Sequence, residues 1–387
     1  MTARLSRALL VAVLLGTSAF VQAQAQAPAV ADPKTSIDRL SAFDYAARMN
    51  AARQLRRVPR EQAFPALSTA VRQHADQFVR ARALILLTGF GPVGISEAMQ
   101  QAMTDRNDRL REVAYRWFAL HPEPRLTQAL LNALNTEQAE FVRPALIRAL
   151  AALGTDPQVQ RALLAEAGRG LDFFRSAVIE ALGDNKAAYA AETIAAISKL
   201  DGQLRDDAVM ALGRIGGLEA RSTLATFTNP PLDLIPSLQA ALCFVDDACT
   251  VRVEVLRDTA RSRAASVTQV RSAVRALGAV ASNGHPGAAA TLIELAGGAT
   301  GPLVNELAIA LSTAAIRRPA FVIQWLASAP EASRATATRL LREGFESLEE
   351  DFAEEQFFAA ARAAYWAAPE NSTTRTITAT LIDTLEF

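Results

Sequence analysis

The side chains that most often carry catalysis are few in this chain and lie far apart in sequence. The three histidines are His74, His121 and His285, and no two of them have a spacing that places them on one face of a helix. The sequence contains no His-Glu-x-x-His metal motif, no Gly-x-Ser-x-Gly elbow and no phosphate-binding Gly-x-x-x-x-Gly-Lys loop. We therefore expect no catalytic residue, no metal site and no cofactor, and predict that the protein is not an enzyme.

Adjacent carboxylates occur at Asp206-Asp207 and at Asp246-Asp247. Neighbouring residues of a helix point in different directions, so such a pair does not converge on one reacting atom. We expect Asp206 and Asp207 to be solvated residues in the first turn of a helix, where negative charge is favourable.

An apolar pattern recurs about every thirty residues along most of the chain. Its clearest copy contains Ala208 and the run Ala211-Leu212-Gly213. The residues that align with Leu212, called the anchors below, are Leu55, Leu87, Phe118, Leu150, Leu182, Leu212, Leu242, Leu277, Leu311, Leu341 and Leu381. Four positions before the anchor, all eleven copies are apolar and six have alanine. This step keeps both positions on one helical face, where alanine allows a neighbouring helix to approach closely.

The position two residues before each anchor points away from the core in this alignment. Five of the eleven copies have arginine there, where the arginine content of the chain predicts about one. These arginines are Arg53, Arg116, Arg148, Arg275 and Arg339. A stripe of guanidinium groups can bind carboxylates or phosphates bidentately, so these five are the candidate partner-binding residues. The alternative is that exposed helix positions favour long polar side chains and that this chain prefers arginine throughout.

Each repeat contains a further helix before the one that carries the anchor. Examples are expected at residues 157–166, 188–199, 218–227, 251–260 and 286–295. Pro124, Pro157 and Pro286 open such helices, where the missing N–H is not needed. Gly154, Gly183, Gly213 and Gly278 follow the anchors and are expected to act as C-terminal caps. The predicted fold is all-α, an α-solenoid of about eleven helix-turn-helix repeats.

An apolar-Arg pair precedes the Ala-Leu-Gly run in the clearest copies. These copies are Phe174-Arg175 with Ala181-Leu182-Gly183, Leu204-Arg205 with Ala211-Leu212-Gly213, and Val270-Arg271 with Ala276-Leu277-Gly278. The pattern resembles bacterial HEAT repeats, including those of phycobilisome lyases, over roughly residues 40–387. It departs from the family at Pro236 and Asn305, where no arginine follows the apolar residue. The resemblance implies a right-handed superhelix whose second helices line a concave surface that binds protein partners.

The N-terminus has the features of a secretory signal. Arg4 and Arg7 precede an apolar run at residues 8–20, and small-residue sites follow at Ala23 and Ala27. We expect a signal peptide over residues 1–27, a flexible lead-in over 28–39 and the repeat domain over 40–387. Cleavage after Ala23 or after Ala27 remains open, and an uncleaved anchor is the alternative. After cleavage no stable membrane span is expected, and the location is periplasmic or secreted.

Cys243 and Cys249 are the two cysteines of the chain, and in an exported protein they predict one disulfide. On a continuous helix, residues six apart would lie about 9 Å apart along the axis and on different faces, beyond the reach of a disulfide. The helix must therefore end between them, near Val245-Asp246-Asp247. Closing so short a loop stabilises the fold by about 2 kcal/mol in the chain-entropy model. Two free buried thiols are the alternative.

Charge is unevenly distributed although the net charge is zero. Residues 34–82 carry ten basic and four acidic side chains, whereas residues 343–355 carry seven acidic and no basic ones. Zero net charge argues against nucleic acid as a partner. The acidic run is interpreted as a solvated turn or, alternatively, as a partner site or a head-to-tail contact with the basic end.

The sequence favours an exported non-enzymatic scaffold that binds a protein partner of unknown identity. One alternative is an accessory or regulatory subunit of an envelope enzyme. Another is a structural envelope component that binds an anionic ligand through the arginine stripe. The fold alone does not decide among them.

Overall fold

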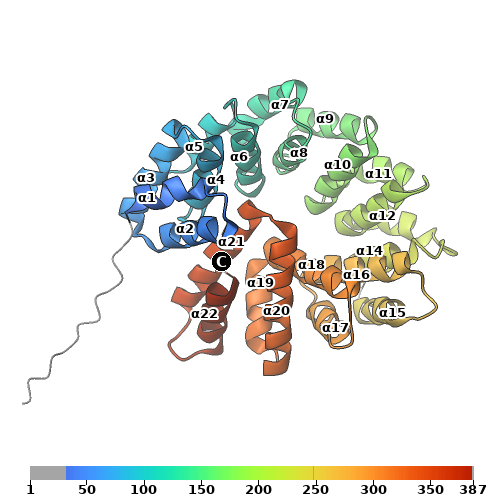
Figure 1. The fold of residues 1–387 in the computed structure, drawn as a ribbon. Helices are drawn as coiled ribbons and strands as arrows, with labels where there is room; N and C mark the ends of the chain where they lie inside the picture. The colour runs from blue at the N-terminus through green and yellow to red at the C-terminus, as the bar shows by residue number, and fades with distance from the viewer. Residues whose placement is uncertain (1–31, 247, 386–387) are drawn as a thin grey trace, which may run out of the picture.

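The structure, a computed structural model, describes residues 32–246 and 248–385 (Figure 1). This part of the chain consists of 22 α-helices and three short 3-10 helices and contains no strand. The predicted all-α fold is confirmed. The expected signal peptide at residues 1–27 lies outside the described residues.

The helices form eleven consecutive pairs. The first helices of the pairs are α1 Pro33–Asp38, α3 Arg60–Gln73, α5 Ser96–Ala102, α7 Thr127–Thr136, α9 Pro157–Ala167, α11 Ala191–Ile197, α13 Gly217–Ala225, α15 Cys249–Arg261, α17 Pro286–Ala296, α19 Pro319–Ser328 and α21 Asp351–Ala367. The second helices are α2 Tyr45–Arg57, α4 Gln77–Thr88, α6 Asp108–Leu120, α8 Arg143–Ala151, α10 Asp172–Asp184, α12 Gln203–Ile215, α14 Ile235–Val245, α16 Val267–Ser282, α18 Pro302–Arg317, α20 Glu331–Leu348 and α22 Thr373–Leu385.

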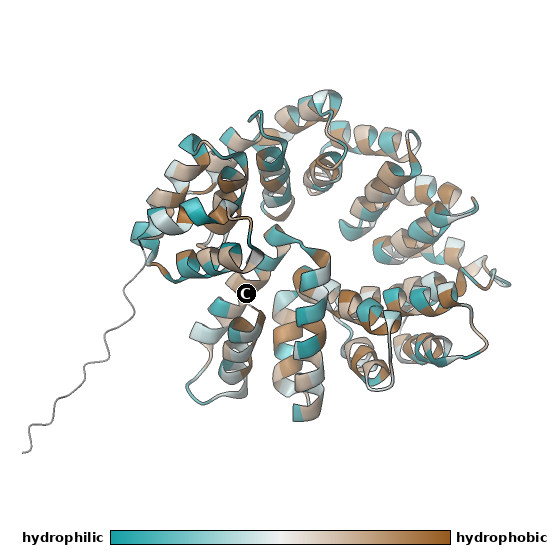
Figure 2. Ribbon diagram, in the orientation of Figure 1, coloured by the Kyte–Doolittle hydropathy of each residue, from teal (hydrophilic) through white to brown (hydrophobic). Residues whose placement is uncertain are grey.

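The pairs are stacked into a strongly curved superhelix (Figure 1). From α5 to α12, the second helices lie inside the curve and the first helices lie outside it. From α4 to α20, successive second helices pack on one another more extensively than successive first helices do. Apolar residues are concentrated where the helices face each other, and polar residues mark the turns (Figure 2). The curve brings α21 against α4, so that the two ends of the solenoid meet.

All eleven anchors lie in second helices, one in each. Ten of them are buried and Leu242 is partly buried. The predicted period therefore identifies every repeat. The first pair begins earlier than expected, because Asp32 caps α1 and Ile37 of that helix is buried. Residues 33–39 thus belong to the folded part rather than to a flexible lead-in.

None of the four glycines after the anchors caps a helix; Gly154 lies beyond the end of α8, whose C-cap is Ala152. Gly183, Gly213 and Gly278 lie inside α10, α12 and α16. A Cβ at Gly213 would stand 2.5 Å from the Cα of Ala241 in α14, and one at Gly183 would stand 2.9 Å from the Cα of Ala211 in α12. The prediction of caps was wrong because the glycine is needed for close contact between neighbouring second helices.

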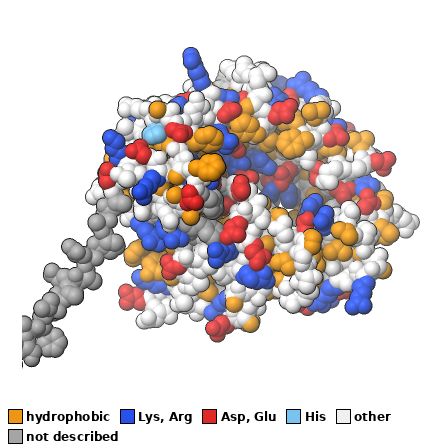
Figure 3. All heavy atoms as spheres, viewed as in Figure 1, with side chains coloured by type: hydrophobic (Ala, Val, Ile, Leu, Met, Phe, Trp, Pro, Cys, Tyr) orange, Lys and Arg blue, Asp and Glu red, His pale blue; other side chains and the backbone are white. Residues whose placement is uncertain are grey.

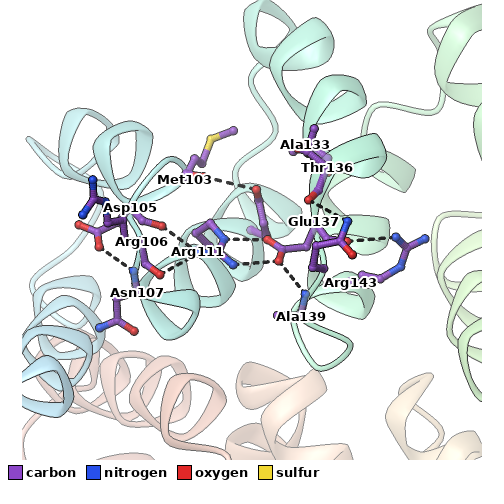
Figure 4. Close-up of polar contacts among 12 residues, drawn as sticks. Met103, Asp105, Arg106, Asn107, Arg111, Ala133, Thr136, Glu137, Ala139 and Arg143 are labelled. Carbon is purple, nitrogen blue, oxygen red and sulfur yellow. Dashed lines mark hydrogen bonds and ion pairs between the residues drawn. The ribbon is translucent and has the colours of Figure 1, made fainter.

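The arginine at the start of a second helix binds the turn that precedes it. Arginine-to-carbonyl hydrogen bonds of this kind are Arg48 to Ala42, Arg80 to Val71, Arg111 to Asp105, Arg143 to Glu137, Arg175 to Ala167 and Arg334 to Ala329. Arg111 also pairs with the Glu137 carboxylate at 2.7 Å, and Glu137 belongs to the turn of the next repeat (Figure 4). The guanidinium hydrogen bonds hold the pKa of Glu137 below its usual value despite burial. Arg111 therefore ties together two consecutive turns.

Cys243 and Cys249 lie at disulfide distance, with their Cα atoms 4.3 Å apart. Helix α14 ends at Val245 and α15 begins at Cys249, so the helix ends between the two cysteines as the sequence requires. The bridge joins the seventh pair to the eighth across the turn.

Replacing Gly213 with Ala is expected to lower the free energy of unfolding by about 1–3 kcal/mol, because the new methyl group meets the backbone of Ala241. In an unobstructed helix the same change would stabilise by up to about 1 kcal/mol. Gly287→Ala in α17 is the matched control, since only the His285 side chain is near and can move. Urea denaturation measures both variants. Equal or raised stability of Gly213→Ala would contradict the close packing.

Candidate functional site

The junction between the two ends of the solenoid is held by charged side chains from α2, α4, α6 and α21. The Glu355 carboxylate in α21 is fully buried and accepts from Arg56 Nε at 2.7 Å and from Arg362 Nη2 at 3.0 Å. Gln356 Nε2 donates to Thr88 Oγ1 at 2.8 Å. Because Arg56 and Glu355 are 299 positions apart in sequence, this contact fixes the curvature of the entire superhelix.

The turn between α20 and α21 places its acidic residues on the concave surface of the N-terminal repeats. Glu350 pairs with Arg116 of α6, and Asp351 lies 3.7 Å from Arg82 of α4. The predicted head-to-tail contact therefore exists, but it forms within one chain. The solvated-turn interpretation is wrong for Glu354 and Glu355, which are buried.

The remainder of the acidic run does face solvent. Glu343 and Glu346 pair with Arg339 and Arg342 one helical turn earlier in α20. The run thus has two parts, of which only the part from Glu350 onward takes part in the junction.

Negative charge is crowded at this junction. Burial, and then the charge of Asp351, raises the pKa of Glu354 to about 7. Burial, together with the charge of Glu350, also raises the pKa of Glu112 in α6. Arg56 and Arg82 line the same cavity as Glu354 from α2 and α4, and the charge of Arg56 offsets only part of this crowding.

A second charged cluster lies where the C-terminal turns of several second helices meet. Glu180 of α10 pairs with Arg148 of α8 at 2.9 Å and with Arg317 of α18. Asp184 accepts from Arg214 of α12 at 3.0 Å and from Arg317 at 3.1 Å. Burial alone would raise the pKa of Glu180, but the arginines lower it to about 2. This cluster connects α10 to α18 across the concave surface.

A cavity of about 420 Å³ opens beside this cluster. Its charged lining consists of Arg148, Asp184, Lys186, Arg214, Arg317 and Arg318. Among the described residues, the side chains of Lys186 and Arg318 have no ion pair. Basic and acidic side chains gather in the hollowed centre of the molecule (Figure 3).

The five candidate arginines of the stripe lie on second helices but do not converge on one site. Arg116 belongs to the junction and Arg148 to the cavity. Arg275 is exposed and lies 3.4 Å from Glu306, Arg339 pairs with Glu343, and Arg53 is partly buried in α2. Their role in partner binding stays a prediction.

Sequence reasoning missed Lys186, Arg214, Arg317 and Arg318. These residues stand at different distances after their anchors, so the repeat alignment does not bring them into register. The available signal was a basic residue in the last turn of α12 and of α18, Arg214 and Arg317, where positive charge is favourable.

Asp206 and Asp207 are not solvated, contrary to expectation. Asp207 accepts a hydrogen bond from Ser176 of α10, and burial raises its pKa. Asp206 pairs with Arg205 at 2.9 Å and accepts from Ser237 of α14 at 3.4 Å. Both carboxylates therefore link α12 to its neighbours.

The histidines remain separate in space. His74 lies 3.3 Å from Asp38, His121 stacks on Trp117, and His285 caps α17 by accepting from Ala288 N. In the part of the chain that the structure describes, no group of three or more His, Cys, Asp or Glu residues could hold a metal ion. None of the described helices combines the length and apolar character needed to cross a membrane.

Residues 95–183, which span the pairs from α5–α6 to α9–α10, match the family model of HEAT repeats. The same helix pair recurs on both sides of this segment. The chain therefore contains HEAT repeats at residues 95–183 and has an α-solenoid fold.

Among solved structures, human deoxyhypusine hydroxylase in complex with glycerol is similar at 19% identity and a TM-score of 0.29, covering 66% of this chain and 96% of that one. UNC-45 from Drosophila melanogaster is similar at 12% identity and a TM-score of 0.26, covering 92% of this chain and 62% of that one. At such TM-scores neither structure bears on the function of this chain. No curated protein matches the sequence.

Reversing the charge of the turn, with Glu350→Lys and Asp351→Lys, is expected to open the junction because both residues would then repel Arg116 and Arg82. Small-angle scattering should show a larger radius of gyration. Glu343→Lys with Glu346→Lys changes the net charge equally at the solvated part of the run and should leave the radius unchanged. An identical response of the two variants would refute closure by these pairs.

Replacing Glu354 with Gln is expected to remove one source of pH dependence. The folded pKa of about 7 exceeds the reference value of 4.5, so the folded state binds more protons between these values. The contribution of Glu354 to stability is therefore complete below pH 4.5 and is lost as the pH rises through about 7.

Glutamine has nearly the same shape as a protonated glutamate, and it keeps the side-chain oxygen that accepts a hydrogen bond from Glu350 N. Glu354→Gln should match the wild type at pH 4.5 and exceed its free energy of unfolding by roughly 2 kcal/mol at about pH 8. Denaturation at the two pH values measures the difference, and equal stability at the higher pH would show that the crowding has no energetic effect.

Proposed function

We propose that this HEAT-repeat protein is an exported, non-enzymatic scaffold that binds a protein partner on its concave surface. HEAT repeats typically mediate protein interactions, and repeat solenoids present extended concave surfaces for this purpose. The observation that carries the proposal is the closure of the solenoid by Arg56, Arg116 and the acidic end of α20–α21.

Closure matters because it removes the main flexibility of a solenoid. An open superhelix can vary in pitch and curvature. A partner that must order it binds more weakly, because part of the binding free energy is spent on the ordering. Here the buried Glu355 contact and the cluster around Glu180 hold the concave surface from two directions. A surface held in this way is prepared for binding before the partner arrives.

The absence of recognisable catalytic patterns in the sequence supports the non-enzymatic role, and the N-terminal pattern at residues 1–27 supports export. Export is tested by fractionating cells that express the full chain and sequencing the N-terminus of the product. A mature N-terminus at Gln24 or at Pro28 in the periplasm or medium is expected. An intact N-terminus in the cytoplasm would overturn the exported location.

The mature chain, used as bait on an envelope fraction, is expected to retain a reproducible protein partner. The variant with Glu350→Lys and Asp351→Lys should retain it about tenfold less, because its concave surface is no longer held. The Glu343→Lys, Glu346→Lys variant is the control and should behave as the wild type. Quantitative mass spectrometry measures the retained protein. Failure of the wild type to retain any partner, or equal capture by the opened variant, would overturn the proposal.

A further inference from the structure

The cavity beside Glu180 has more positive than negative side chains. Five basic residues and one acidic residue line it, and Glu180 contributes one further carboxylate to the arginines. Glu180 and Asp184 satisfy Arg148, Arg214 and Arg317, whereas Lys186 and Arg318 have no carboxylate partner among the described residues. The C-terminal ends of α10, α12 and α18 carry partial negative charge and compensate only part of this excess.

The basic groups remain accessible although protein surrounds them. Arg148 keeps 40% and Arg317 keeps 31% of its side chain exposed. Burial is the main cause that lowers the pKa of Arg214; Arg317 adds to the effect, and Asp184 opposes it. The cavity volume of about 420 Å³ is within the range of sites that hold a small ligand or a short segment of chain.

Lys186 adds a second, independent observation. It follows α10 in a Schellman motif, in which Lys186 N donates to Gly183 O and Ala187 N donates to Leu182 O. Lys186 has a φ of 50°, at the position where glycine is usual and unstrained. Lys186 thus lines the cavity from a strained backbone position, and such positions cluster at functional sites.

At the other end of the concave surface, an arginine of the same stripe binds an acidic residue of the chain itself. Arg116, one repeat before Arg148 and at the same position relative to its anchor, holds Glu350 of the acidic turn. The turn approaches as a run of consecutive acidic residues, from Glu349 to Asp351. An acidic segment is thus a ligand that this concave surface already binds within the chain.

We propose that the cavity lined by Lys186, Arg214 and Arg318 binds an acidic peptide segment of the protein partner. This inference rests on the proposed scaffold function and specifies the chemistry of its partner. Lys186 and Arg318 supply the unpaired positive charge, and the arginines fixed by Glu180 and Asp184 keep the cavity open and in place.

Isothermal titration of the full mature chain with a decaglutamate peptide at low salt tests the proposal. Lys186→Gln with Arg318→Gln should weaken binding about tenfold relative to the wild type. Lys199→Gln with Arg263→Gln removes the same charge at exposed positions outside the cavity and should leave the affinity within about twofold. Equal weakening by both variants would show non-specific attraction and overturn the site.

Citrate and inorganic phosphate are titrated in the same way. Binding of either one in place of the peptide would show a site for a free anion and overturn the assignment to a protein segment. Lys186→Gly separates function from folding, since it relieves the backbone strain and removes the charge. It should raise the thermal midpoint and weaken peptide binding, whereas a lower midpoint with unchanged binding would contradict the inference.

The bait experiment distinguishes this inference from the function on which it rests. If the wild type retains a partner and the Lys186→Gln, Arg318→Gln variant retains it equally, the cavity is not the site and the scaffold function stands. If the wild type retains no partner, the scaffold function itself fails.

Discussion

The close approach of successive second helices is the constraint on which the architecture depends. At Gly183 and Gly213 there is no room for a Cβ, because the backbone of the next second helix lies against the glycine. Alanine at the facing position completes a contact between nearly bare backbones. The first helices have less extensive contacts with one another. A stack that is tight on one side and looser on the other must curve toward the tight side, and the ten steps between the eleven pairs bring the ends together.

Charged side chains then determine which helices contact each other inside the curve. Side chains of second helices that would face open water in a straight solenoid instead face each other across a small space. Arg317 reaches α10 from a position 133 to 137 residues away, and Arg56 reaches α21. Removing one partner of the Arg56–Glu355 pair would leave a buried charge and cost far more than an exposed pair contributes. The crowding of Glu354, Glu350 and Asp351 works against closure, so that the junction combines strong attraction with repulsion.

Local patterns predicted the repeat and could not predict the closure. The anchors follow from helical periodicity, and all eleven helix pairs were recognisable from them. The same local reasoning assigned Gly183, Gly213 and Gly278 to helix ends, because a glycine needed for close packing and a capping glycine look alike in sequence. Asp206 and Asp207 were assigned to solvent because their partners, Ser237, Ser176 and Arg205, belong mostly to other repeats. Residues of the cavity come from seven second helices, α6 to α18, and only the accumulated curvature brings these helices together.

The meeting of α21 with α4 also bears on how such a chain can evolve. An open solenoid gains or loses repeats freely, since each repeat contacts only its neighbours, and it requires polar terminal repeats to shield its exposed ends. In this chain the two ends shield each other. Duplication or deletion of one unit would alter the total rotation and separate Arg56 from Glu355. The contact between the two ends thereby depends on the number of repeats, and fraying from either end of the solenoid must first break that contact.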